Sequence, residues 1–194
     1  MLIHPQSISE SEVEFSTDEI ENDLPDSRWY ALRTRSRQEK TAASMLGMLR
    51  IPHFLPLKSE LRHWSDRKQA VLVPLFSGYL FVRSNMMKDR RLQVLKTPGI
   101  VGFVGNSTGP LPIPDEQIDN IRQVLNCGVE CSVHSLLQEG DHVRIVRGAL
   151  CGIEGRVVRT GSTLRLLIVI ETICQTLAVN ISTQDIEPMI EPAC

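Results

Sequence analysis

The chain has 194 residues, 42% of them hydrophobic and 23% charged, with a formal net charge of −2. This length suits one large domain or two small ones, and no apolar run approaches the roughly 18 residues of a membrane-spanning helix. The N-terminus lacks the basic and apolar regions of a secretory signal. The five cysteines contain no CxxC pair, which disfavours structural zinc and fits a reducing cytoplasm better than a disulfide framework.

Charge is distributed unevenly along the chain. Residues 1–27 hold eight Asp or Glu and no Lys or Arg, a net of −8, whereas residues 28–126 have a net of +9 and residues 127–194 a net of −3. This segregation predicts a basic middle domain that meets an anionic partner. The first 27 residues have only scattered apolar side chains, so they are predicted to be a disordered acidic tail.

The first ordered elements are expected directly after this tail. Residues 28–34 have the composition of a strand. Ser36 and Glu39 have the spacing of a helix-capping box, and apolar residues at helical spacing follow until Pro52 ends the helix. The next expectations are extended segments at 53–57 and 61–64, a polar turn at 66–68, and an approach to the next strand at 71–73.

The most strand-like stretch runs from residue 74 to residue 82, with the sequence PLFSGYLFV. If it is extended, its side chains alternate between two faces, Tyr79, Phe81 and Arg83 on one and Leu80 and Val82 on the other. A strand that is apolar on both faces is usually a buried core strand. The alternative is that one face offers its aromatic side chains to a partner.

The rest of the middle domain continues the alternation of helices and strands. A charged helix is expected over 88–96, a strand over 100–104 and a loop over 105–112. Pro114 suits the first position of a further helix with acidic residues in its first turn. The apolar face of that helix is Ile118, Ile121, Val124 and Leu125. The order β-α-β-β-β-α-β-α predicts an α+β sandwich.

The C-terminal part has a different pattern. Residues 127–138 lack periodicity and are predicted to be a linker. Short strands are then expected at 143–146, 155–159, 164–170 and 176–181, joined by turns that contain glycine. This spacing predicts a small all-β barrel.

Enzymatic motifs are missing from the sequence, which has no Gly-rich phosphate loop, no GxSxG and no HExxH, so an enzyme is disfavoured and no cofactor or metal is expected. Arg33, Arg35, Arg37 and Lys40 are the candidate nucleic-acid-binding residues. They surround a strand-to-helix junction, where side chains and helix N-terminal amides can both face phosphates. The alternative for such a cluster is a solvated basic face.

Several of these stretches resemble the NusG family of transcription elongation factors. Residues 28–30 (RWY), 75–82 (LFSGYLFV) and 97–104 (TPGIVGFV) resemble the family's N-terminal domain. Residues 139–157, EGDHVRIVRGALCGIEGRV, resemble its KOW motif, and the match ends near residues 186–189, IEPM. The Pro-Leu-Phe before Gly78-Tyr79 is similar to the specialised paralogues, RfaH and the capsule-operon antiterminators.

The resemblance implies a fold and a domain division. The fold is an α+β chain with a NusG-type α/β sandwich on an antiparallel sheet, followed by a small SH3-like KOW β-barrel. The expected parts are an acidic tail (1–27), a polymerase-binding domain (28–126), a linker (127–138) and a KOW domain (139–190). The glycines and β-branched residues of 139–188 predict that this segment stays a barrel and does not refold into the helical hairpin of RfaH.

The resemblance also implies a bacterial, cytoplasmic factor that binds the clamp helices of RNA polymerase beside upstream or non-template DNA. It would suppress pausing or termination, on a subset of operons. By alignment, the polymerase-binding pocket is an exposed apolar cluster made of Phe76, Tyr79, Phe81, Phe103, Ile118 and Ile121. Arg90 and Arg91 align with a second contact site. The specialised paralogues carry His-Thr-Thr there, and that motif reaches the second pincer of the polymerase.

At the tip of the KOW turn, Leu150 and Ile153 would contact a small-subunit ribosomal protein or a termination factor. The alternative is that both side chains fill the end of the barrel. Thr41, Met45 and Met48 replace basic residues of the sequence-specific paralogue, so the same DNA element is not implied. Two other functions stay open, a housekeeping NusG-like factor and a ribosome- or RNA-binding KOW protein. The second predicts a basic barrel, whereas residues 127–194 are net acidic.

Overall fold

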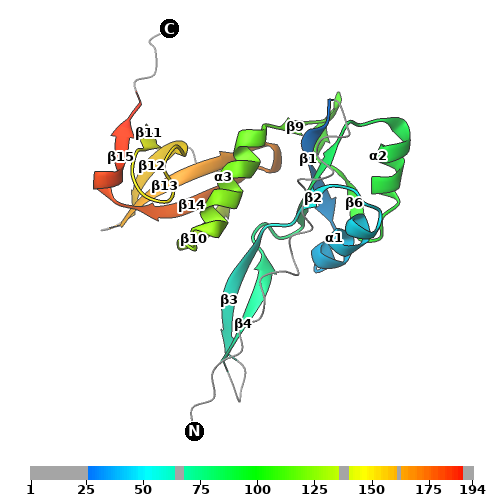
Figure 1. Cartoon of the computed structure of the whole chain (residues 1–194), viewed down its shortest axis with the longest axis horizontal. Helices are drawn as coiled ribbons and strands as arrows, with labels where there is room; N and C mark the ends of the chain where they lie inside the picture. The colour runs from blue at the N-terminus through cyan, green and yellow to red at the C-terminus, as the bar shows by residue number, and fades with distance from the viewer. Residues whose placement is uncertain (1–25, 64–67, 136–139, 161–162, 190–194) are drawn as a thin grey trace.

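The computed structural model of the chain describes residues 26–63, 68–135, 140–160 and 163–189. Nearly all of the predicted acidic tail therefore lies outside the described residues, as do Trp64, most of the predicted turn at 66–68 and the end of the predicted linker. An N-terminal body and a C-terminal barrel lie on either side of helix α3 (Asp115–Asn126), and a hairpin projects away from both (Figure 1).

The N-terminal body is built on an antiparallel sheet in the order β2-β5-β1-β6. Its strands are β1 (Arg28–Thr34), β2 (His53–Phe54), β5 (Tyr79–Ser84) and β6 (Ile100–Phe103), and β9 (Pro112–Ile113) also pairs with β1. The alternation predicted for residues 79–83 is confirmed in its core residues. Phe81 belongs to the apolar cluster that contains α3, and Leu80 and Val82 belong to the cluster that contains α1 (Glu39–Met48).

Helix α1 does not begin with the predicted capping box. Gln38 is its N-cap residue, and no side chain caps it. The backbone of Arg37 has φ 60°, which turns the chain so that Ser36 lies outside the helix. The carboxylate of Glu39 instead accepts a hydrogen bond of 2.8 Å from the backbone N–H of Gly78. Because Glu39 is only 5% exposed, this bond fastens the helix start to the turn before β5.

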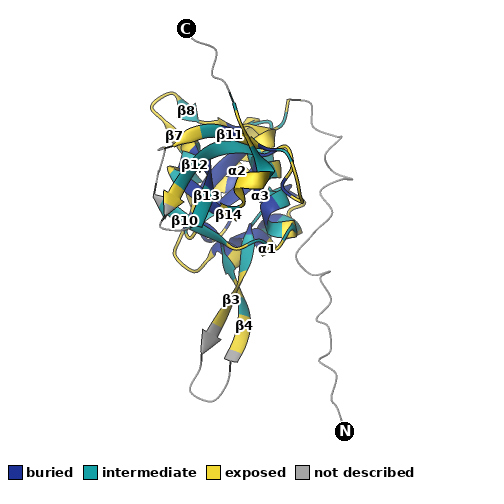
Figure 2. Cartoon of the chain, turned by 90° about the vertical axis from the view of Figure 1, so that its left-hand side faces the viewer, coloured by how far each residue is buried: buried dark blue, intermediate teal, exposed yellow. Residues whose placement is uncertain are grey.

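Two further elements complete the N-terminal body. Helix α2 (Lys88–Leu95) lies where the charged helix was predicted, and α3 begins one residue after Pro114, which is its N-cap. Strands β3 (Leu57–His63) and β4 (Lys68–Pro74) form a two-stranded antiparallel hairpin that stands clear of the rest of the chain (Figure 2). The predicted loop at 105–112 contains a small pair, β7 (Gly105–Asn106) with β8 (Gly109–Pro110).

The C-terminal part forms one six-stranded antiparallel sheet in the order β10-β14-β13-β12-β11-β15. Its strands are β10 (Cys131–Ser135), β11 (Asp141–Ile145), β12 (Glu154–Thr160), β13 (Thr163–Ile170), β14 (Gln175–Ile181) and β15 (Ile186–Pro188). Its only described helices are two 3-10 turns, η4 (Glu171–Ile173) and η5 (Thr183–Asp185). The predicted α+β fold with a C-terminal β domain is confirmed.

The prediction that residues 127–138 form a linker is wrong at its centre. Cys131–Ser135 pair with β14 over five positions and extend the barrel sheet. The physical reason is that β14 offers a free edge and that Val133 packs against the core. A five-residue strand with two apolar side chains is too short for periodicity to reveal.

Candidate binding surfaces

One face of the N-terminal sheet has an aromatic cluster at its centre. The rings of Phe76 and Phe81 meet edge to face with centroids 6.1 Å apart, and those of Phe54 and Phe81 stack at 6.2 Å. Both distances are typical of favourable aromatic pairs. Phe76 is 1% exposed and Phe81 is fully buried, whereas Tyr79, at the edge of the same face, is half-buried.

Helix α3 covers this aromatic face. Its residues Ile118 and Ile121 have no exposed surface. Arg122, on the same helix, places its guanidinium 5.3 Å from the ring centroid of Trp29 and 5.2 Å from that of Phe54. These cation–π contacts identify the side of α3 that faces the sheet.

The opposite side of α3 faces the barrel. The side-chain amide of Gln123 donates to the carbonyl oxygens of Ala149, at 2.8 Å, and Cys151, at 3.3 Å. The Cys127 thiol also donates to the Ala149 oxygen, at 3.3 Å. The acceptors belong to the tip of the KOW turn, which needs the positive φ values of Gly148 and Gly152 to turn toward the helix. Helix α3 is therefore held between the sheet and the barrel.

A single apolar cluster consequently runs from the N-terminal sheet through α3 into the barrel core. Leu150, at 7% exposed, and Ile153, at 1%, both belong to it. The two residues predicted to contact a partner at the KOW tip are thus buried in this arrangement. That is the outcome expected if they fill the end of the barrel.

The prediction of an exposed apolar pocket is wrong in two respects. Phe76, Phe81, Ile118 and Ile121 do come together, but they are buried because α3 packs on the sheet and the barrel packs on α3. Phe103 does not join them. It pairs with Leu32 in the sheet register, which places it on the α1 face, where its ring meets that of Tyr30 edge-on at 6.0 Å.

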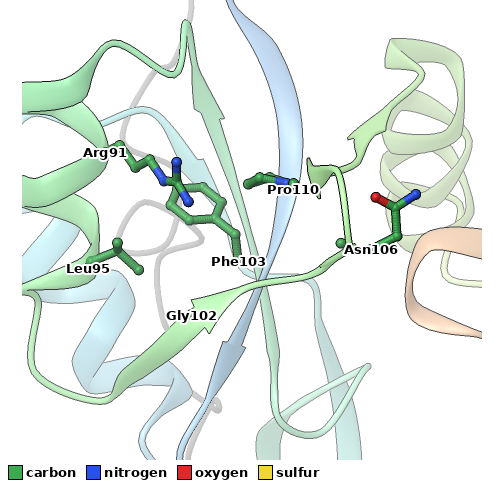
Figure 3. A pocket seen from close by; sticks show the side chains of 8 residues that line it. Arg91, Leu95, Gly102, Phe103, Asn106 and Pro110 are labelled. Atoms are coloured by element: carbon green, nitrogen blue, oxygen red, sulfur yellow. The ribbon is translucent and has the colours of Figure 1, made fainter.

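Phe103 instead lines a shallow pocket of about 320 Å³ between α2, β6 and the β7–β8 pair. Figure 3 shows the side chain of Arg91 lying against the Phe103 ring, with Leu95 beside them. Arg91 is exposed and Arg90 is half-buried. Leu92 of α2 and Val101 of β6 are also exposed apolar side chains. The two predicted polymerase contacts therefore lie on different faces of the sheet.

The basic cluster lies at the end of β1 and in the turn that follows. Arg33, Arg35 and Arg37 are exposed, and no ion pair involves them in the part of the chain that the structure describes. Arg33 is the cross-strand partner of Tyr79, so the cluster borders the aromatic face. The fourth predicted residue, Lys40, donates from its ammonium to the Leu72 oxygen at 2.8 Å and ties α1 to the hairpin.

Two glycine turns fix the backbone of this cluster. The carbonyl of Gly78 accepts from the Thr34 N–H at 2.9 Å, and the carbonyl of Gly99 accepts from the Arg35 N–H at 2.8 Å. Both glycines have positive φ, 82° and 90°, which L side chains rarely adopt. With the Glu39–Gly78 bond, these contacts hold the arginine-bearing turn in one conformation.

Among the described residues, His53 and Cys131 have shifted pKa values, and neither is one of the predicted binding residues. Burial lowers the pKa of His53, although its ring N–H donates to the Ile51 oxygen and opposes that shift. Burial also raises the pKa of the Cys131 thiol, which therefore stays protonated and unreactive. Within the described ranges, no three His, Cys, Asp or Glu side chains are grouped to hold a metal ion, and no helix is long and apolar enough to cross a membrane.

Comparison with known proteins identifies the family. The profile described as "Transcription termination factor nusG" matches residues 27–122. The transcription termination/antitermination protein NusG of Thermus thermophilus is 31% identical over 149 residues, which cover 66% of this chain and 80% of the relative. The chain belongs to the NusG family. It is therefore a non-enzymatic transcription termination/antitermination factor.

Other relatives agree with this assignment. NusG of Deinococcus radiodurans is 28% identical over 154 residues, 66% of this chain and 81% of the relative. NusG of Streptococcus pyogenes serotype M1 is 39% identical over 87 residues, 43% of this chain and 48% of the relative. The solved structure described as "Domain interaction in Thermotoga maritima NusG" shares the fold, with a TM-score of 0.53 at 19% identity, and covers 84% of this chain and 98% of that one.

Sequence reasoning missed two of the residues that define these surfaces. Gln123 has an ordinary polar position on a helix, and nothing in the sequence distinguishes its barrel-facing amide from a solvated one. Glu39 was interpreted as half of a capping box, although its carboxylate binds a turn 39 residues away. The Ser-Gly pair before Tyr79 indicates a tight turn, and such a turn leaves a backbone N–H that needs an acceptor. This is the sequence signal that could have indicated the role of Glu39.

Proposed function

We propose that this NusG-family chain binds RNA polymerase at the clamp through an apolar surface made of Phe76, Tyr79 and Phe81 on the sheet side and Ile118 and Ile121 on α3, and that it suppresses pausing or termination. The observation that supports this most is the continuous apolar cluster between that surface and the barrel. A surface that is apolar enough to hold a second domain is also suited to anchoring a polymerase helix.

Because this surface is buried, the proposal requires two conformations of the chain, a closed one and an open one. In the closed form the barrel packs on α3 and covers the apolar surface that α3 shares with the sheet. The polymerase binds a form in which the barrel has moved away and the border between α3 and the sheet, where Tyr79 lies, is accessible. Among the described residues, Gln123 and Cys127 donate hydrogen bonds across the α3–barrel contact. Each such bond contributes only about 1 kcal/mol, so most of the cost of opening comes from the apolar contacts between α3 and the barrel. Polymerase binding must supply that free energy, since a partner shifts the equilibrium only by its preference for the open form.

Two further contacts belong to the same proposal. Arg90 and Arg91, beside the α2–β6 pocket, are suited to an acidic surface on the second pincer of the polymerase. Arg33, Arg35 and Arg37 border the proposed polymerase face and are suited to phosphates of upstream or non-template DNA. Such a factor acts on the transcription machinery, so we place it in the bacterial cytoplasm.

The barrel has its own proposed role once it is released. Leu150 and Ile153 would then be available to a small-subunit ribosomal protein or a termination factor. The Pro-Leu-Phe before Gly78-Tyr79 supports a role on a subset of operons. Chromatin immunoprecipitation tests this, because occupancy at nearly all genes would indicate a housekeeping factor instead.

Binding of the full chain to core RNA polymerase tests the central proposal. Tyr79→Ala truncates a half-buried ring at the edge of the face without opening the core. We expect a loss of about 10-fold or more in affinity, on the scale of interface anchors. Met48→Ala, at a side chain that is 74% exposed at the end of α1, is the control. Equal affinities for the two variants, with matched thermal unfolding, would refute the proposed face.

The DNA contact is tested separately. Each arginine that neutralises a phosphate contributes nearly one to the slope of log affinity against log salt. Arg35→Ala should therefore flatten that slope on elongation complexes by about one unit. An unchanged slope would mean that the cluster is a solvated face.

A further inference from the structure

The arginine-bearing turn is a concentrated positive charge without a counterpart in the described chain. Arg33, Arg35 and Arg37 lie within five residues and are all exposed. The carboxylate closest in sequence, Glu39, is buried and accepts from the Gly78 N–H, and it makes no ion pair with these arginines within the described residues. Uncompensated positive charge of this density attracts any polyanion that can reach it.

Two other carboxylates of the N-terminal body have arginine partners elsewhere. Asp115 lies 3.9 Å from Arg83, and Asp119 lies 3.2 Å from Arg122. The first pair joins α3 to β5 and the second lies within α3. Neither carboxylate is on the β1–α1 turn, so these pairs leave the arginine cluster unneutralised.

The chain itself contains the complementary polyanion. Residues 1–25 hold seven Asp or Glu and no Lys or Arg. They end three residues before Arg28, the first residue of β1, and the arginine cluster lies at the other end of that strand. From Arg28 to Arg35 an extended strand covers about 23 Å. A 25-residue segment can span up to about 85 Å, so it can reach the arginines with length to spare.

We propose that the acidic N-terminal segment, residues 1–25, docks on the Arg33/Arg35/Arg37 cluster and competes there with the phosphates of nucleic acid. Carboxylates and phosphates present the same chemistry to a guanidinium, which binds either through paired N–H donors. A tethered anion acts at high effective concentration, so weak contacts suffice to displace non-specific DNA. The inference rests on the proposed DNA contact and adds an internal competitor to it.

The test uses the full chain with all seven Asp and Glu residues of positions 1–25 changed to Asn and Gln. Fluorescence anisotropy with a random-sequence 20-mer DNA duplex compares its affinity with that of the unmodified chain. We expect neutralisation to raise affinity by about 10-fold at low salt and the difference to vanish near 0.5 M salt, where exposed charges are screened. A synthetic peptide of residues 1–25, added to the neutralised chain, should restore competition, and its Asn/Gln version should not.

Neutralisation also changes the net charge of the whole protein, which by itself favours DNA binding. A double-mutant cycle separates the two effects. If the segment docks on the cluster, neutralising it in an Arg35→Ala/Arg37→Ala background should change DNA affinity by less than about 2-fold. A full gain in that background overturns docking and leaves only long-range charge.

The remaining outcomes distinguish this inference from the proposed DNA contact. Equal affinity with and without the tail charges, together with weaker binding by Arg35→Ala/Arg37→Ala, would overturn the docking and leave the DNA contact in place. DNA affinity that is unaffected by the arginine substitutions in both backgrounds would overturn the DNA contact and the docking together.

Discussion

The contact between α3 and the barrel should control how readily the chain binds polymerase. Gln123→Ala removes the amide that donates to the oxygens of Ala149, at 2.8 Å, and Cys151, at 3.3 Å. The first bond is well formed and the second is long, so we assign about 1–1.5 kcal/mol to the pair. The substitution should therefore destabilise the closed form by that amount and leave the open form unchanged.

This free energy converts directly into affinity. When the closed form dominates, apparent affinity for polymerase is the intrinsic affinity reduced by the fraction of open chains. A loss of 1–1.5 kcal/mol in the closed form raises that fraction by about 5- to 13-fold. Affinity of the full chain for core RNA polymerase should rise by the same factor. Most substitutions near a binding face weaken binding, so an increase is a specific signature of opening.

Surface plasmon resonance with immobilised core polymerase measures this, and hydrogen exchange at the KOW tip gives an independent reading. Exchange should accelerate at the turn around Ala149, while strands β13 and β14 stay protected. Asn126→Ala is the control, because Asn126 is an exposed residue of the same helix. Unchanged or reduced polymerase affinity in Gln123→Ala, relative to Asn126→Ala, would refute the two-state reasoning.

Three further predictions concern stability. Glu39→Ala leaves the half-buried Gly78 N–H without its acceptor and should cost about 1–2 kcal/mol of unfolding free energy in denaturant titration. Glu39→Gln keeps a carbonyl acceptor and should cost clearly less, and equal losses would contradict the bond. Gly99→Ala introduces a side chain at a backbone φ of 90° and within 3.1–3.4 Å of Gln38, so the melting temperature of the protein should fall. In Gly102→Ala the added methyl group has no atom within 4 Å, so that variant should melt nearer to the unmodified chain. Burial lowers the pKa of His53, so the unfolded state binds more protons and the free energy of unfolding should decline as pH falls below about 6.5. His53→Gln should make the free energy of unfolding depend less on pH in this range, and an unchanged dependence would assign it to another group.

The sequence predicted the elements well because their patterns are local. Alternation in residues 79–83 and the helical spacing of Ile118 and Ile121 each report on which side of one element is apolar, and both were correct. The start of α1 was wrong because a capping box is a purely local inference. The acceptor of the Gly78 N–H comes from Glu39, and only the tertiary fold brings the two together.

The candidate surfaces were less predictable because the sequence pattern of an apolar face does not indicate which surface packs against it. Phe81 and Ile121 have the same sequence pattern whether they meet a partner protein or the chain's own second domain. Phe103 was misplaced for a different reason. Its face depends on pairing with Leu32, and β1 carries a register shift between Arg33 and Thr34 that no sequence pattern indicates.

One contact buries both proposed partner surfaces, and this has a thermodynamic consequence. The α3–barrel packing covers the apolar surface that α3 shares with the sheet, and it also encloses Leu150 and Ile153 in the same cluster. On the two-state proposal, a partner that takes the released KOW tip binds only the open form, as the polymerase does. Each ligand then removes the cost of opening for the other, so their affinities must rise by the same factor. Polymerase and the KOW partner are thus expected to bind cooperatively without touching each other, with the opening equilibrium that Gln123 biases as their only link.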